Sequence, residues 1–140
     1  MARHLLRYLL LLCCVLLLAG CPQEGGKNGA LDRIQIDYSA AIRWGNFEGA
    51  YNLIEPTVRE EHPLTDIDFS RYKQVQISSY RDLDTRMLPN GDVVRLIEIG
   101  VISRHNLTER TVRYQEVWHY DEEKKAWWQM SGLPDLWQGE

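Results

Sequence analysis

The stretch VVRLIEIGVISR, residues 93–104, is the most apolar of the segments that have the character of a β-strand. The turn before it, LPNGD at residues 88–92, contains Asn90-Gly91, the strongest short hairpin signal in the chain. We therefore predict that residues 93–104 form the second arm of a β-hairpin, and that the rest of the fold is built around this hairpin.

Three further segments predict strands on the two sides of this one. Residues 70–83 alternate apolar Val75 and Ile77 with polar neighbours, which is typical of a half-buried strand. Residues 109–120 follow, and a polar loop at 121–125 joins them to a last strand at 126–131. Every second residue of the 109–120 strand is expected to lie on the same face, which gives Val112, Tyr114, Glu116, Trp118 and Tyr120 one common face.

The first half of the domain has the periodicity of helices. Leu31 to Trp44 repeats apolar residues at helical spacing, and Phe47 to Ile54 predicts a shorter second helix with Asn46 as its N-cap. A further turn is expected at 57–61. Helices followed by antiparallel strands predict one α+β domain over residues 31–140, with N-terminal helices packed on a curved antiparallel sheet of three to four strands.

The N-terminus has the organisation of a bacterial secretory signal. A basic region with Arg3 and Arg7 precedes an apolar run at residues 8–19, which is shorter than the roughly 20 residues that span a bilayer. Leu18-Ala19-Gly20-Cys21 ends this run and resembles the lipobox of bacterial lipoproteins. The resemblance implies a signal peptide over residues 1–20, cleavage before Cys21, and acylation of Cys21 by diacylglyceryl and fatty acyl chains such as palmitate.

An acylated Cys21 would make the lipid bilayer the first partner of the mature protein, since two or more acyl chains anchor a protein stably. Residues 21–30 then comprise the lipidated cysteine and a flexible, glycine-rich tether. Pro22 stands where many lipoproteins of the inner membrane carry Asp. We therefore expect the periplasmic face of the outer membrane rather than the inner membrane.

Charge and cysteine content exclude several classes of function. The chain has a formal net charge of −4, and removal of Arg3 and Arg7 with the signal peptide would leave −6. An acidic protein is not expected to bind nucleic acid, which requires clustered positive charge. Cys13 and Cys14 would be lost with the signal and Cys21 consumed by lipid, so disulfides and cysteine chemistry are not expected in the mature domain.

The order of elements resembles the NTF2-like, cystatin-related α+β cone. The resemblance rests on the corner RWGNFEGAY at residues 43–51, the long hairpins, and the closing segments EVWHY at 116–120 and Trp127-Trp128. It implies helices packed into the mouth of a curved sheet around a cone-shaped cavity. Members of that family include isomerases, dehydratases, binders of small apolar ligands and dimerising accessory domains. No catalytic set of the family can be matched to this chain.

Two carboxylates are the best candidates for polar groups of such a cavity. Glu98 and Glu116 each lie mid-strand among apolar residues, where burial would raise the pKa and allow acid or base chemistry. The favoured interpretation is that they form cross-strand ion pairs with arginines. The candidate partners are Arg95, Arg104, Arg110 and Arg113.

No metal or cofactor is expected. His62, His105 and His119 lack the spacing of metal ligands. The aromatic residues either line a ligand cavity or fill the core between helix and sheet, and the core is the favoured interpretation. These residues are Trp44, Tyr51, Tyr80, Tyr114, Trp118, Trp127 and Trp128.

The sequence therefore favours a non-enzymatic, membrane-anchored lipoprotein that faces the periplasm and acts through protein contacts. Its partner would be another envelope protein or a second copy bound through the outer face of the sheet. The first alternative is a module that holds a small apolar ligand in the cone. The second is an isomerase- or dehydratase-like enzyme, which requires Glu98 or Glu116 to face an open pocket without an arginine partner.

Overall fold

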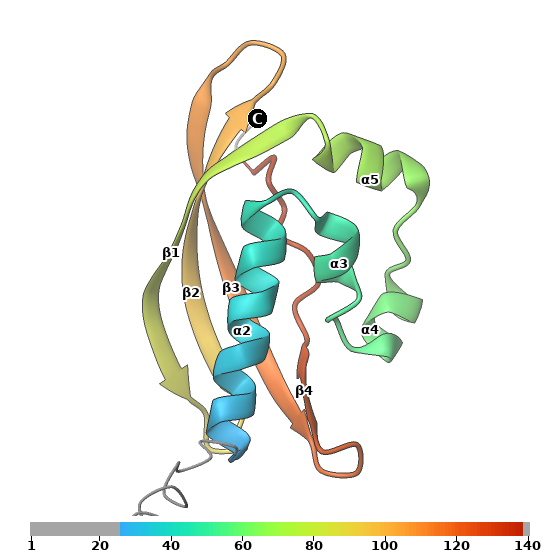
Figure 1. Cartoon of the computed structure of the whole chain (residues 1–140), viewed down its shortest axis with the longest axis vertical. Coiled ribbons are helices and arrows are strands. Elements are labelled where there is room, and N and C mark those ends of the chain that lie inside the picture. The colour runs from blue at the N-terminus through green and yellow to red at the C-terminus, as the bar shows by residue number, and fades with distance from the viewer. Residues whose placement is uncertain (1–25, 139–140) are drawn as a thin grey trace, which may run out of the picture.

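The computed structural model describes residues 26–138. The expected signal peptide, Cys21 and the first part of the tether lie outside the described residues. The α+β class is confirmed, because helices precede a four-stranded antiparallel sheet (Figure 1).

The first described helix, α2 (Lys27–Arg43), begins one turn before the predicted start at Leu31. The segment 27–30, which we assigned to the flexible tether, is therefore helical. Residues that are distant in sequence hold the first of these positions: Trp127 Nε1 donates to the carbonyl of Lys27 at 2.8 Å, and Lys27 Nζ lies 2.9 Å from a carboxylate oxygen of Glu122. These contacts outweigh the low helix propensity of Asn28 and Gly29.

Three short helices follow: α3 (Phe47–Tyr51), α4 (Pro56–Glu61) and α5 (Asp66–Tyr72). Asn46 caps α3 as predicted, because its Oδ1 accepts from the Gly49 N–H at 2.9 Å. The prediction for α5 was wrong, since its last turn was assigned to a strand beginning at Ser70. A capping box between Thr65 and Asp68 begins this helix.

The sheet has the order β1-β2-β3-β4, with antiparallel pairing throughout. Its strands are β1 (Val75–Met87), β2 (Val93–Ser103), β3 (Glu109–Asp121) and β4 (Ala126–Gln129). The predicted hairpin turn is confirmed, because Gly91 takes a φ of 88° and the Leu88 N–H donates to the Asp92 carbonyl at 2.8 Å. The last strand ends at Gln129, two residues earlier than predicted.

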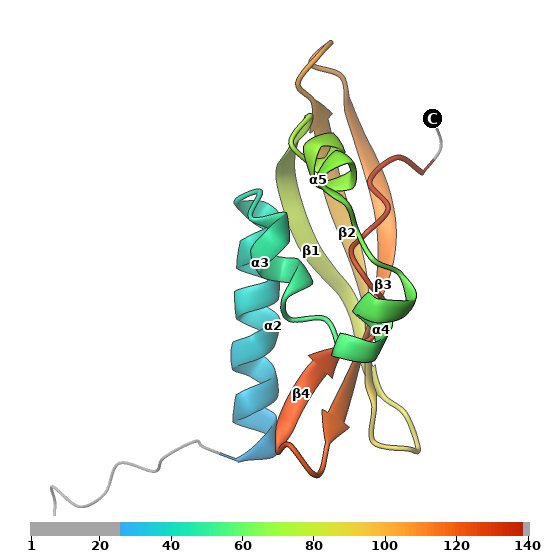
Figure 2. The ribbon, with the colours of Figure 1, turned by 90° about the vertical axis from the view of Figure 1, so that its right-hand side faces the viewer.

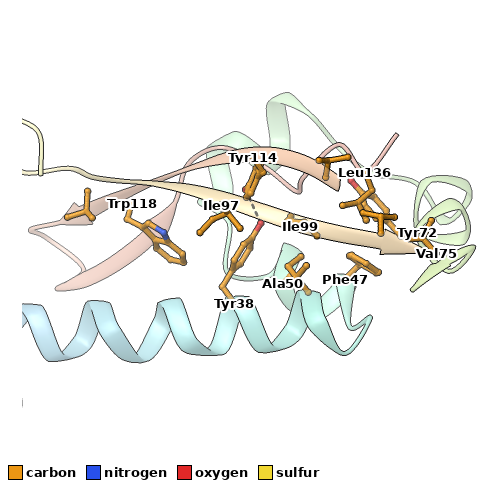
Figure 3. Close-up of a cluster of buried hydrophobic side chains, with 14 of the residues drawn as sticks. Tyr38, Phe47, Ala50, Tyr72, Val75, Ile97, Ile99, Tyr114, Trp118 and Leu136 are labelled. Atoms are coloured by element: carbon orange, nitrogen blue, oxygen red, sulfur yellow. Dashed lines mark hydrogen bonds between the residues drawn. The ribbon is translucent and has the colours of Figure 1, made fainter. Parts of the chain in front are cut away.

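Helix α2 runs along one face of the sheet, and the core fills the space between them (Figures 2 and 3). Tyr38 from α2 meets Trp118 from β3 edge to face, with ring centroids 5.6 Å apart, and both side chains are fully buried. Ile97 and Ile99 of β2 complete this layer. The space between α2 and the sheet, where the family resemblance implied a cavity, is thus packed with side chains.

Helix α2 lies roughly along the long axis of the domain (Figure 1). With 17 residues and a rise of about 1.5 Å per residue, it is about 25 Å long. It begins beside the β3–β4 loop and ends at the corner that leads into α3 (Figure 1). The chain therefore enters the domain at one end and places the α2–α3 corner well away from it. Within residues 26–138, no helix has the length and apolar character needed to cross a membrane.

Candidate interaction site at the corner between α2 and α3

The two predicted carboxylates lie on opposite faces of the sheet. Glu98 is on the outer face, where Arg81 Nη2 donates to its Oε1 and Arg113 is its neighbour in the β2–β3 register. Glu116 is on the inner face, between buried Tyr114 and Trp118. The structure therefore does not bring the two together into one site.

Glu116 is fully buried, and its carboxylate accepts hydrogen bonds from three side chains. Tyr80 donates to Oε1, while Oε2 accepts from Trp118 Nε1 at 2.8 Å and from Arg95 Nη1 at 3.2 Å. Burial raises the pKa of Glu116 above its ordinary value of 4.5, and the hydrogen bond from Tyr80, the charge of Arg95 and the hydrogen bond from Trp118 oppose this rise. The carboxylate is therefore enclosed by the protein, and neighbouring side chains use its hydrogen-bonding capacity.

A second polar cluster lies deeper under α2 and was not anticipated from the sequence. The hydroxyls of Tyr38 and Tyr114 are 3.0 Å apart, and both approach the carbonyl of Gly132. Gln129, also fully buried, donates to Tyr114 through Nε2 and accepts the Ser131 N–H at 3.0 Å. This cluster ties the segment after β4 to the core. Burial raises the pKa of both tyrosines, so they are neutral at physiological pH.

These arrangements bear on the enzymatic alternative. It requires Glu98 or Glu116 to face an open pocket without an arginine partner, and in the structure each has one. Among residues 26–138, no group of three or more His, Asp or Glu side chains is placed to hold a metal ion. The favoured interpretation of the aromatic residues as core is confirmed for most of them: Tyr114, Trp118 and Trp127 belong to the core, and Tyr80 packs against it.

Trp44 differs from these aromatic residues, because 84% of its surface is exposed. It is the C-cap of α2, which ends in a Schellman motif: the Gly45 N–H donates to Ile42 and the Asn46 N–H donates to Ala41. Gly45 has a φ of 73°, which glycine adopts without strain. The local backbone thus fixes where the chain turns and places the tryptophan at an exposed corner.

A hollow of about 290 Å³ lies on one side of Trp44. It is formed between the end of α2, the start of β1 and Arg104, which follows β2. Arg43 and Arg104 both line it, and no carboxylate of the described residues lies within 4 Å of either guanidinium. Arg104 is held in place by a hydrogen bond from its Nε to the carbonyl of Val75 at 3.1 Å. The hollow therefore combines an exposed aromatic ring with two positive charges that lack a carboxylate partner.

A second, smaller hollow of about 160 Å³ lies on the α5 side of the same corner. Gly45 and Phe47 line both hollows, so the corner stands between them. Lys73 and Glu48 line the smaller hollow and approach each other to 3.7 Å. We call residues 43–48, together with Arg104, the α2–α3 corner.

Two other segments contribute exposed apolar side chains at this end of the domain. Ile67 in α5 is 81% exposed, and Leu107 in the β2–β3 hairpin is 77% exposed. Both segments lie, with the end of α2, in the half of the domain opposite the start of α2 (Figure 1). Together with Trp44 they are the most exposed large apolar residues of the described chain. Exposed apolar residues that stand singly are ordinary on a protein surface, so the candidate site is defined by Trp44 and the hollow beside it.

Comparison with known proteins adds no relative. No family model matches the chain, and searches of curated proteins and of solved structures found no match.

Proposed function

We propose that this protein is a bacterial lipoprotein that presents the α2–α3 corner to an acidic segment of another envelope protein. In this proposal Cys21 carries the lipid anchor, the domain faces the periplasm from the outer membrane, and the α+β fold is a variant of the NTF2-like cone. The protein acts by contact and not by catalysis.

The observation that carries the proposal is the exposure of Trp44 beside Arg43 and Arg104. Tryptophan and arginine are the residue types most enriched at the energetic centres of protein interfaces. Two guanidinium groups without a carboxylate partner favour a ligand that supplies carboxylates, since Arg–carboxylate hydrogen bonds are strong and directional. The chain as a whole is acidic, whereas this hollow is lined by two arginines. An acidic partner would therefore be attracted to this hollow and repelled by much of the remaining surface.

The distance from the anchor supports this orientation. Five residues separate Cys21 from Lys27, and an extended chain spans at most about 3.6 Å per residue, so the start of α2 lies within roughly 20 Å of the lipid. Helix α2 then adds about 25 Å before the corner. The tether and α2 together allow the corner to lie as far as about 45 Å from the lipid, within reach of a protein partner in the periplasm.

Site-specific photo-crosslinking in living cells tests the proposal. A benzophenone amino acid at position 44 should give a crosslinked product with one discrete protein, mapped to a segment rich in Asp and Glu. Ile36 is the matched control position, because it is exposed on the same helix and lies away from the corner. The double change Arg43→Glu and Arg104→Glu should abolish the product, while Arg86→Glu on exposed β1 should leave it unchanged.

Several results would contradict the proposal. Identical products from positions 44 and 36 would show that the corner has no specific partner. A product insensitive to the two arginine changes would exclude an acidic segment, and a product with a second copy of this chain would replace the envelope partner with a homodimer. Crosslinking to lipid alone would assign the corner to a membrane surface.

A further inference from the structure

A larger pocket shares no lining residue with the two hollows at the α2–α3 corner. Its volume is about 400 Å³, and it is formed between the short helices and the segment that follows β4. The lining residues belong to none of the four strands: Tyr51, Ile54, Val58, Arg59, Glu61, His62, Leu64, Tyr72 and residues 130–133. A pocket of this size is within the range of small-molecule sites.

The walls of this pocket are fixed by hydrogen bonds between the short helices. The Tyr51 hydroxyl donates to the carbonyl of Arg59 and accepts the N–H of Leu64, both at 3.3 Å. On the opposite side, the Tyr72 hydroxyl donates to the carbonyl of Pro134 at 3.0 Å. The pocket is therefore held open by tertiary contacts and is not a gap between loose segments.

Arg59 lines this pocket, and one of its hydrogen-bond donors has no acceptor among the described residues. Its Nε is buried and has no hydrogen-bond acceptor within the described residues. Its Nη1 is 3.5 Å from Oδ1 of Asn52, and its guanidinium carbon lies 5.7 Å from the centre of the Tyr51 ring. No carboxylate of the described residues lies within 4 Å of it. Buried donors are normally paired, so the guanidinium of Arg59, which lines the pocket and lacks a carboxylate among the described residues, favours an acceptor supplied from outside the chain.

The remaining lining residues restrict the ligand further. Val58, Leu64 and Leu133 provide apolar walls, which suit a hydrocarbon or aromatic body. Glu61 and His62 are exposed, and the carboxylate of Glu61 would repel a ligand with several negative charges. A single carboxylate on an apolar body complements the Arg59 guanidinium and the apolar walls together.

We propose that this pocket binds a small monocarboxylate with an apolar body, which accepts a hydrogen bond from Arg59 and packs against Val58, Leu64 and Leu133. The site is separate from the α2–α3 corner, so it adds a ligand-binding function to the proposed interaction. It also differs from the ligand site expected from the sequence, because it lies outside the space between α2 and the sheet.

Fluorine NMR with a matched set of probes tests the site. The full-length lipidated protein in nanodiscs is titrated with 4-(trifluoromethyl)benzoate, with its neutral amide and with 4-(trifluoromethyl)benzylammonium, and empty nanodiscs correct for partitioning into lipid. The benzoate should bind at least about tenfold more tightly than the amide, as expected for a charge-assisted hydrogen bond. Arg59→Gln should remove this preference, and Arg86→Gln should preserve it.

Two further measurements keep the result decisive. Circular dichroism and thermal unfolding establish that Arg59→Gln is folded, and Val58→Trp, which fills the pocket and keeps Arg59, should also abolish binding. Equal binding of benzoate and amide, or an unchanged benzoate affinity in Arg59→Gln, would overturn the proposal. Crosslinking at position 44 should be insensitive to both pocket variants, which separates a failure of this site from a failure of the corner.

Discussion

Arg95 Nη1 lies 3.2 Å from Glu116 Oε2, and the two residues are direct neighbours in the β2–β3 register beneath α2. The same arginine donates through Nε to Asp82 on β1 at 2.9 Å. One guanidinium thus connects a fully buried carboxylate to one that is partly exposed, across three strands. Such a buried pair costs desolvation free energy, and its stability depends on the protonation of Glu116.

We expect Glu116→Gln to change how stability depends on pH. Because burial raises the pKa of Glu116, the folded state binds more protons than the unfolded state between the ordinary carboxyl pKa of 4.5 and the raised value. The contribution of Glu116 to the free energy of unfolding is therefore greatest below this window and falls as pH rises through it. Urea denaturation at several pH values should show wild-type stability declining relative to Glu116→Gln from about pH 4 upward.

Arg95→Met is the matched control for this pair. It leaves Glu116 buried without its cation, and breaking a buried pair typically costs about 3–5 kcal/mol near neutral pH. The loss should shrink at pH 4, where Glu116 is protonated. A difference that is independent of pH in both variants would show that Glu116 titrates with an ordinary pKa.

Two tryptophans should differ in their contribution to stability. Trp118 is fully buried against Tyr38, so Trp118→Ala removes its packing and leaves a cavity, at a cost of about 3–5 kcal/mol. Trp44 is mostly exposed, and Trp44→Ala should change the free energy of unfolding by less than about 0.5 kcal/mol. Chemical denaturation followed by circular dichroism compares them, and similar losses would contradict the assignment of Trp44 to a surface site.

Gly100→Ala tests the close packing at the β1 bulge. A Cβ at Gly100 would lie 2.6 Å from Ser79 Oγ and 3.3 Å from the Ser79 backbone nitrogen, and closer still to Ser78 Oγ. Overpacking of this kind typically costs about 1–3 kcal/mol. Gly26→Ala is the control, since nothing lies within 4 Å of its added Cβ. Equal melting temperatures for the two variants would mean that the bulge relaxes without strain.

Cys21→Ser tests the lipid anchor. We expect this change to prevent labelling by radioactive palmitate and cleavage after Gly20, since serine lacks the thiol that accepts the diacylglyceryl group. The domain should remain folded, because the core of the described residues lies entirely within positions 31–136. Labelling and fractionation of cells provide the measurement. Continued incorporation of palmitate into Cys21→Ser would exclude the lipobox assignment.

Local signals in the sequence were sufficient for most of the sheet. Asn90-Gly91 identified the β1–β2 turn because a tight hairpin requires positive φ, and Gly91 provides it. The alternation on β3 identified its inner face, since Val112, Tyr114, Glu116 and Trp118 are all buried. Both features are set by residues that lie next to one another in the sequence, so the sequence alone is enough to predict them.

The errors arose where contacts between distant residues override local preference. Lys27 begins a helix because it contacts Glu122 and Trp127, which are about a hundred positions away. The Thr65–Asp68 capping box is a local signal for the start of α5. The strand predicted from Ser70 begins too early, because residues 70–72 form the last turn of that helix. A strand pattern by itself does not mark where the preceding helix ends.

The sequence by itself determined that helices precede an antiparallel sheet, the α+β class, the hairpin turn and the inner face of β3, because each follows from periodicity and turn chemistry. Only the tertiary structure decided that Glu98 and Glu116 lie on opposite faces, that the space under α2 is filled, and that Trp44 is exposed beside two arginines. These properties depend on which distant segments pack together, and burial and charge pairing are consequences of that packing.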